Sequence, residues 1–159
     1  MDETIAAICP ATCATIGVFA PACAPPTQFS FFPGPATFAA ARAHCQAIGG
    51  DLASIRSAAE NAEALALSAG QWALIGFTDS ANEGNWIWTD GNAASYTNWN
   101  DGEPNDSGGN EDCAQLYGSS FEWGRGQWND ISCDQQDGYL CGSPMTPSAP
   151  PFPPGQAPA

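Results

Sequence analysis

Two short stretches, Glu103-Pro104-Asn105-Asp106 and Trp128-Asn129-Asp130, bracket the most distinctive part of the chain. Between Glu103 and Cys133 lie six carboxylates, an X-Pro bond and two cysteines, and the only cation is Arg125. Such a density of oxygen donors is typical of a site for a hard divalent cation. A polar surface loop is the alternative interpretation, which the glycines at 102, 108 and 109 also favour.

The charge of the chain supports the metal interpretation. Seventeen acidic residues stand against three arginines and no lysine, and twelve of the seventeen acids fall between Asp79 and Asp137. Nucleic acid is excluded as a partner because its phosphates would be repelled, and anionic membranes are disfavoured for the same reason. No apolar run is long enough for membrane insertion. Concentrated carboxylates destabilise a fold unless a cation neutralises them, so we expect bound metal.

Seven cysteines in 159 residues indicate a disulfide framework and a secreted, extracellular protein. None forms a C-x2-C pair, so a zinc site is not supported. The odd number leaves one thiol free or paired between molecules. Three cysteines, Cys9, Cys13 and Cys23, lie near the N-terminus, and their spacing does not say which pair.

The pattern predicts one domain with two appendages: a Cys/Pro-rich N-terminal extension at 1–27, a folded domain at 28–142 and a proline-rich tail or linker at 143–159. The expected elements of the domain alternate in type, which indicates an α+β fold. In chain order the first elements are a strand at 28–32, stopped by Pro33-Gly34-Pro35, a helix at 37–48, a strand at 51–55 and a helix from 57 to about 69. Strands at 72–77 and 85–89 follow, then a long loop at 91–111 that is either functional or disordered, and strands at 113–117, 127–130 and 139–141.

His44, the only histidine, precedes Cys45 on the first expected helix. Adjacent helical positions point in different directions, so the two side chains do not form a nucleophile and base pair. We therefore interpret His44 as a surface residue. No other nucleophile-base arrangement is evident, and the paired acids are better explained as metal ligands than as glycosidase acids, so no enzyme is expected.

The ordered set of motifs resembles the C-type lectin-like domain family over roughly residues 29–142. Glu103-Pro104-Asn105 is similar to the sugar-selecting tripeptide of that family, and Trp128-Asn129-Asp130 is similar to its closing strand motif. The buried strand at 72–77 matches its core signature strand. The resemblance implies a C-type lectin-like fold of two helices, small antiparallel sheets and a long calcium-binding loop, stapled by disulfides Cys45–Cys141 and Cys113–Cys133.

The resemblance also implies a primary Ca²⁺ site that binds sugar directly, with two vicinal hydroxyls completing the shell of the ion. The order Glu-Pro-Asn implies equatorial hydroxyls, as in mannose, glucose, N-acetylglucosamine or fucose-type ligands, whereas Gln-Pro-Asp would imply galactose. We expect the Glu103–Pro104 bond to be cis. The residues of this site are Glu103, Asn105, Glu111, Asn129 and Asp130.

A second, auxiliary calcium site is similarly expected, with Glu111 shared between the ions. Ordinary turn acids are the alternative, although unneutralised carboxylates this close would repel one another. Its expected ligands are Asp79, Glu83, Asp106 and Asp112.

Two features near these sites stay open. Asn105-Asp106-Ser107 is the only Asn-x-Ser/Thr acceptor, and a glycan there would prevent Asn105 from binding metal, so we favour the ligand. Phe121 and Trp123 either stack on a sugar or partner, or pack against the core.

The expected function is calcium-dependent carbohydrate binding, with glycans or glycoproteins as partners. The alternative is a structural or adhesive extracellular subunit that uses the lectin-like fold for protein contacts, with self-assembly or an intermolecular disulfide through an N-terminal cysteine. Ice binding, which some members of the fold perform, is more remote.

Overall fold

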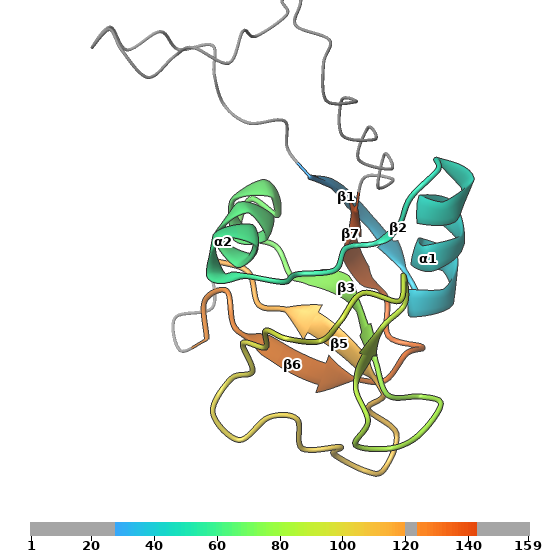
Figure 1. Ribbon diagram of the computed structural model, residues 1–159, viewed down its shortest axis with the longest axis vertical. Helices are drawn as coiled ribbons and strands as arrows, with labels where there is room; N and C mark the ends of the chain where they lie inside the picture. The colour runs from blue at the N-terminus through green and yellow to red at the C-terminus, as the bar shows by residue number, and fades with distance from the viewer. Residues whose placement is uncertain (1–27, 120–123, 143–159) are drawn as a thin grey trace, which may run out of the picture.

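The computed structural model describes residues 28–119 and 124–142. The predictions for the extension at 1–27, the tail at 143–159, Phe121 and Trp123 lie outside these residues. The described residues form two helices and seven strands (Figure 1). The elements are β1 (Phe29–Ala36), α1 (Phe38–Ala47), β2 (Asp51–Leu52), α2 (Ala58–Leu67), β3 (Ala73–Thr78), β4 (Ile87–Trp88), β5 (Cys113–Leu116), β6 (Trp128–Ile131) and β7 (Asp137–Gly142).

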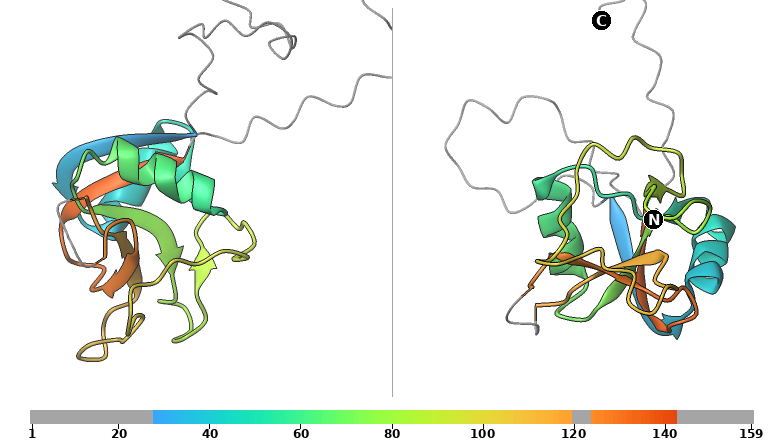
Figure 2. Two further views of the ribbon diagram at one scale, coloured as in Figure 1. Left: turned by 90° about the vertical axis from the view of Figure 1, so that its left-hand side faces the viewer. Right: turned by 90° about the horizontal axis from the view of Figure 1, so that it is seen from below.

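The strands form one mixed sheet in the order β1-β7-β3-β5-β6, with β2 paired to β7 and β4 paired to β3. All pairs are antiparallel except β3 with β7, which is parallel. That parallel pair joins the small antiparallel sheets that the sequence predicts into a single network. The helices lie on either side of β1 and β7, and the long connections gather at the opposite end (Figures 1 and 2).

The helices begin where their capping residues predict. The Thr37 hydroxyl accepts from the Ala40 N–H and the Ser57 hydroxyl accepts from the Glu60 N–H, so each satisfies one free donor of a first turn. Helix α1 ends at Ala47 with Ile48 as its C-cap, and Gly49 follows with a φ of 95°, a left-handed conformation that favours glycine. Both predicted helices are therefore confirmed, with α2 ending slightly earlier than expected.

Two strand predictions need correction. Strand β1 does not stop at Pro33-Gly34-Pro35 but continues to Ala36, with a register irregularity between Phe32 and Ala36. An edge strand tolerates proline at such a bulge, and β1 is an edge strand of this sheet. The strand expected at 51–55 is only Asp51–Leu52 by pairing. Beyond it, Ala53 bridges two strands, donating to the Leu140 carbonyl and accepting from the Gly76 N–H.

Strand β3 runs through the centre of the core, as its apolar sequence predicts. All six of its residues are buried. On one face, Phe77 lies against Trp88 and Trp128 with ring centroids 4.3 and 5.7 Å away. This aromatic cluster fixes the start of β6, because the Asn61 side chain of α2 accepts from the Trp128 indole N–H at 2.8 Å.

Both predicted disulfides are confirmed. Cys45 of α1 is bonded to Cys141 of β7, and Cys113 of β5 is bonded to Cys133 just beyond β6. The first closes a loop of 96 residues, and the chain-entropy estimate for a loop of that size is about 4–5 kcal/mol. The second holds the two ends of the β5–β6 segment together, next to the acidic loop.

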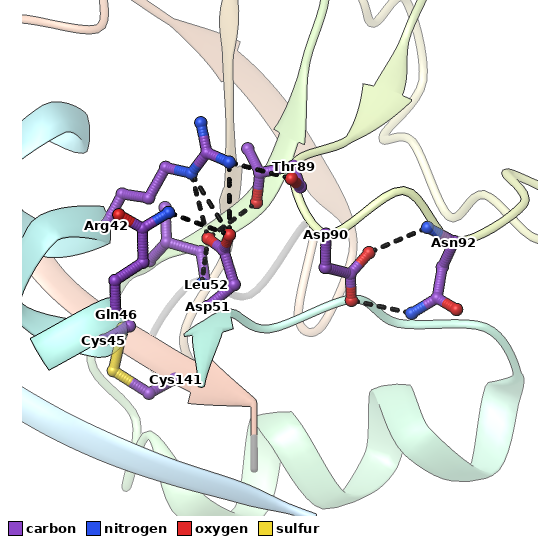
Figure 3. Close-up of polar contacts among 9 residues, drawn as sticks. All are labelled: Arg42, Cys45, Gln46, Asp51, Leu52, Thr89, Asp90, Asn92 and Cys141. Atoms are coloured by element: carbon purple, nitrogen blue, oxygen red, sulfur yellow. Dashed lines mark hydrogen bonds and ion pairs between the residues drawn. A yellow bond between two sulfur atoms is a disulfide. The ribbon is translucent and has the colours of Figure 1, made fainter. Parts of the chain in front are cut away.

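A polar cluster secures α1 to the sheet beside the first disulfide (Figure 3). The Arg42 guanidinium donates to the Asp51 carboxylate at 3.0 and 3.2 Å and to the Thr89 carbonyl at 2.8 Å. Gln46 and the Thr89 hydroxyl also donate to Asp51. One cation and its neighbours thus satisfy a carboxylate whose side chain is only 15% exposed.

The interpretation of His44 as a surface residue is wrong. His44 is half-buried, with its Nδ1 3.0 Å from the Tyr139 hydroxyl and its ring edge-on to Phe32 at 4.7 Å. The first strand and β7 place these aromatic rings beside the helix, which sequence spacing alone does not reveal. Cys45 is in a disulfide, so the two residues form no catalytic pair.

Candidate functional site

The acidic side chains converge from three segments of the chain. The turn after β3 carries Asp79 and Glu83, the long loop carries the Glu103–Asp112 acids, and β6 carries Asn129 and Asp130. The antiparallel pairing of β5 with both β3 and β6 brings the end of β3, the start of β5 and the end of β6 side by side. Thr78 pairs with Cys113, and Cys113 pairs with Ile131. The sheet thereby gathers acids that are up to 51 positions apart, from Asp79 to Asp130.

Asp130 is the centre of the first group. Its side chain is fully buried, and its Oδ2 atom accepts from the backbone N–H groups of Asn105 and Asp106 at 2.9 and 2.7 Å. The loop therefore wraps around a carboxylate supplied by β6. The Glu103–Pro104 bond is cis, as the sequence predicts.

The rest of the first group is held by hydrogen bonds within the loop. The Asn105 amide donates to the Glu103 carboxylate. The Asp106 Oδ1 atom accepts from the Glu111 N–H at 3.0 Å, and the Glu111 carboxylate accepts from the Ser107 N–H at 2.9 Å. These bonds fold the loop back on itself, so that acids eight positions apart face the same region. Asn129, the fifth predicted ligand, is half-buried on β6.

A second group forms where the turn after β3 meets the start of β5. Ligand atoms of Asp79, Glu83 and Asp112 all lie within 4.8 Å of one another. The backbone holds them there: the Asp79 N–H donates to the Asp112 carbonyl at 3.3 Å, and the Gly84 N–H donates to the Asp79 carboxylate at 2.8 Å. Three of the four predicted auxiliary ligands therefore meet. Asp106, the fourth, is close enough to influence the charge of Glu83.

The electrostatics of both groups show unneutralised negative charge. Partial burial, followed by the neighbouring Asp130 and Glu111 carboxylates, raises the pKa of Glu103 from an ordinary 4.5 to about 7. Burial also raises the pKa of Asp79, with Asp112 and Asp130 contributing, despite the hydrogen bond from Gly84. Desolvation and the Asp79, Asp106 and Asp112 charges raise the pKa of Glu83. Each shift reflects the cost of keeping a desolvated carboxylate ionised among other carboxylates.

The residues fit a calcium ion. Two buried carboxylate oxygens, Asp79 Oδ1 and Asp130 Oδ1, have no hydrogen-bond partner among the described residues, and each belongs to one of the two groups. Leaving a charged oxygen buried and unpaired is costly, and a bound cation would satisfy both of these atoms. The donors are carboxylate and amide oxygens, which Ca²⁺ prefers. The arginines Arg42 and Arg56 do not serve, because they pair with Asp51 and Glu60.

Some residues beside the site were not predicted from the sequence. The Tyr117 side chain is buried next to it, and burial followed by the Glu103, Asp130 and Glu111 charges raises the pKa of its hydroxyl. Asn61 holds the start of β6 by accepting from Trp128 and donating to the Gly126 carbonyl at 2.7 Å. Neither shows a sequence signal, since both act through contacts between distant segments.

Comparison with known proteins agrees with this geometry. Residues 34–143 match the model of the Lectin C-type domain family. The chain is 37% identical over 107 residues to the hepatic lectin of Gallus gallus, covering 66% of this chain and 49% of the relative. It is 39% identical over 125 residues to the alpha-N-acetylgalactosamine-specific lectin of Patiria pectinifera, covering 71% of each. The chain thus spans about half the length of the hepatic lectin.

Solved structures give the same result. The carbohydrate-recognition domain of cow CD23 superposes with a TM-score of 0.65 at 34% identity, covering 71% of this chain and 84% of that one. Herring type II antifreeze protein has a TM-score of 0.65 at 29% identity, covering 74% and 90%. The family comprises binding domains and not enzymes, as the sequence predicts. The match over residues 34–143 shows that the chain belongs to the C-type lectin domain family.

Proposed function

We propose that this protein binds carbohydrate through calcium at the first acidic group. The observation that carries the proposal is the buried Asp130 carboxylate, one oxygen of which organises the loop backbone while the other has no partner among the described residues. A cation bound there would supply positive charge and open coordination positions for two sugar hydroxyls. The residues that would hold it are Glu103, Asn105, Glu111, Asn129 and Asp130.

The remaining atoms of these side chains explain how a sugar would be oriented. Carboxylate oxygens accept from sugar hydroxyls, whereas the Asn105 and Asn129 amide nitrogens donate to them. A pair of vicinal hydroxyls that each donate once and accept once therefore matches a Glu and Asn pair. The order Glu103 then Asn105 supports mannose, glucose, N-acetylglucosamine or fucose-type ligands. The sea-star relative is named for N-acetylgalactosamine, so this sugar is the competing specificity.

The second group supports an auxiliary calcium ion. Asp79, Glu83 and Asp112 already converge, Asp106 is close enough to raise the pKa of Glu83, and Asp106 also accepts from the Glu111 N–H. Neutralising Asp79 and Glu83 would remove repulsion next to the first site, because Asp79 senses the charge of Asp130. The auxiliary ion would therefore preserve the shape of the sugar site without touching sugar.

A glycan array with calcium and with millimolar EDTA tests the proposal. Binding to mannose-type glycans in calcium alone is expected, and unchanged binding in EDTA would refute calcium dependence. The variant Asn105→Asp removes an amide donor while it keeps the size of the side chain. It should impair mannose-type binding and leave both disulfides and the far-UV circular dichroism spectrum intact.

An extracellular location belongs to the same proposal, since two disulfides staple the domain. Among the described residues, no helix is long and apolar enough to cross a membrane. The odd cysteine count keeps a second candidate, an adhesive subunit linked through Cys9, Cys13 or Cys23. Such linkage would increase the avidity of weak sugar sites. Monomers alone on non-reducing gels, with no calcium-induced assembly in light scattering, would argue against it.

Asn105 is also the asparagine of the Asn105-Asp106-Ser107 acceptor. Its side chain is exposed, and its nitrogen donates to Glu103 within the proposed sugar site. Ligand and glycan need the same amide group, so an occupied acceptor excludes sugar binding. Intact-mass measurement of protein from a glycosylating host would show which use applies.

A further inference from the structure

Gln115 of β5 has an unusual environment for an amide. Its side chain is fully buried, and its Nε2 atom donates to the Asp137 carboxylate at 2.7 Å. Its Oε1 atom has no hydrogen-bond partner among the described residues. A buried amide oxygen without a donor is costly, so this atom is expected to have a partner in the functional state.

The orientation of the Gln115 amide is fixed from one side. Asp137 at the start of β7 accepts from Gln115 and, at 2.8 Å, from the Gln135 side chain. A carboxylate only accepts, so it holds the Gln115 nitrogen toward itself. The oxygen must therefore point away from Asp137.

Asn129 is the residue of β6 directly across from Gln115. The two are register partners in the antiparallel β5–β6 pair, so their side chains lie on the same face with Cβ atoms about 5 Å apart. The Asn129 side chain makes no hydrogen bond within the range of the chain that the structure describes. A free donor group thus stands across the strand from a buried acceptor that lacks one.

The two N–H groups of the Asn129 amide explain why Gln115 and Asn129 lie across from each other. Under the proposed function, on which this inference rests, the Asn129 carbonyl oxygen faces calcium and one N–H faces a sugar hydroxyl. The amide nitrogen carries a second N–H that also needs an acceptor. We propose that Gln115 is a positioning residue whose Oε1 atom accepts this N–H, so that the Asp137–Gln115 pair fixes which end of the Asn129 amide faces the ion.

The first test compares Gln115→Leu with wild type by calorimetry, using calcium alone and then a mannose-type monosaccharide in calcium. Loss of one hydrogen bond should weaken both affinities about fivefold. Leu74→Ala is the matched control, because Leu74 is buried and is the register partner of Gln115 on its other side. This control should lower the unfolding midpoint and leave both affinities within about twofold of wild type.

A spectroscopic measurement separates positioning from general stability. In the calcium-loaded wild type, one Nδ2 proton of Asn129 should exchange with solvent on the order of tenfold more slowly than in Gln115→Leu. Leu74→Ala should retain the slow proton. Equal exchange in wild type and Gln115→Leu would overturn the inference, and so would equal affinities.

If Gln115→Leu does not fold, a double variant that exchanges the amide and the carboxylate between positions 115 and 137 tests the inference. Gln115→Glu alone sets two carboxylates against each other and should weaken sugar binding. Adding Asp137→Asn restores a donor at that contact and leaves an acceptor for Asn129, so the double variant should recover binding to within about twofold of wild type. A double variant as weak as Gln115→Glu would refute the inference. Absence of calcium binding in wild type would instead refute the proposed function.

Discussion

In two regions of this molecule, the pKa values of buried carboxylates are shifted in opposite directions. Beside α1, burial tends to raise the pKa of Asp51, but hydrogen bonds led by that of Arg42 outweigh burial and lower it. In the two acidic groups, burial and neighbouring carboxylates raise the pKa of Glu103 and Asp79, and no arginine of the described chain pairs with either. The first region supplies its own cation, whereas the second, under the proposed function, takes one from solution.

The largest expected effect on stability comes from breaking the Arg42–Asp51 ion pair beside α1. Asp51→Asn removes the negative charge, replaces one of the two acceptor oxygens with an NH2 donor, and leaves the Arg42 guanidinium without an ion-pair partner. We expect the free energy of unfolding to fall by about 2–3 kcal/mol, equally in calcium and in EDTA. Denaturant titrations in both conditions measure this. A loss that appears only in EDTA would show that the two regions are not independent.

The matching substitution among the crowded acids, Asp79→Asn, should change the free energy of unfolding in opposite directions with and without calcium. Asp79→Asn removes one of three crowded carboxylates, so in EDTA it should stabilise the fold by about 1 kcal/mol. In saturating calcium it should destabilise the protein relative to wild type, because a ligand is lost and less binding energy supports folding. The same titrations read out both signs. Destabilisation in both conditions would indicate that Asp79 is a structural acceptor of the Gly84 N–H and not a metal ligand.

The sequence predicts these two regions to different depths, for a physical reason. Carboxylates spaced along one loop, together with the Glu103-Pro104-Asn105 motif, are visible in the chain and are enough to identify the acidic region. The Arg42–Asp51–Thr89 cluster joins residues up to 47 positions apart, and nothing in the spacing of Arg42 indicates its partner. The same holds for His44, whose aromatic neighbours come from β1 and β7. Sequence patterns indicate which side chains lie near one another along the chain, whereas the pairing of the strands determines which distant side chains they contact.

The pH dependence of stability should also differ between the regions. Glu103 has a folded pKa of about 7, above its ordinary 4.5, so in EDTA the fold gains stability as pH falls through 7 toward the unfolded value. Asp51 has a lowered pKa, so its contribution is complete above its unfolded value and is lost only as pH falls through the folded one. Thermal unfolding from about pH 8 to 3 should therefore show a maximum in EDTA. Saturating calcium should remove the rise near pH 7, since the ion needs ionised ligands.

The smallest effect should come from a second ion pair, between Arg56 just before α2 and Glu60 in its first turn. Their atoms are 2.9 Å apart, and their side chains, 35% and 13% exposed, are as buried as those of Arg42 and Asp51, at 38% and 15%. The difference is that this pair is local, between positions i and i+4, and such pairs contribute little to stability. The Glu60 carboxylate also accepts from the Arg56 backbone N–H at 2.6 Å, which a side-chain change leaves in place. Arg56→Gln should cost about 0.5 kcal/mol, and molar salt should abolish the difference. A cost near that of Asp51→Asn would mean that the further hydrogen bonds from Gln46 and Thr89 to Asp51 add nothing to the value of an ion pair.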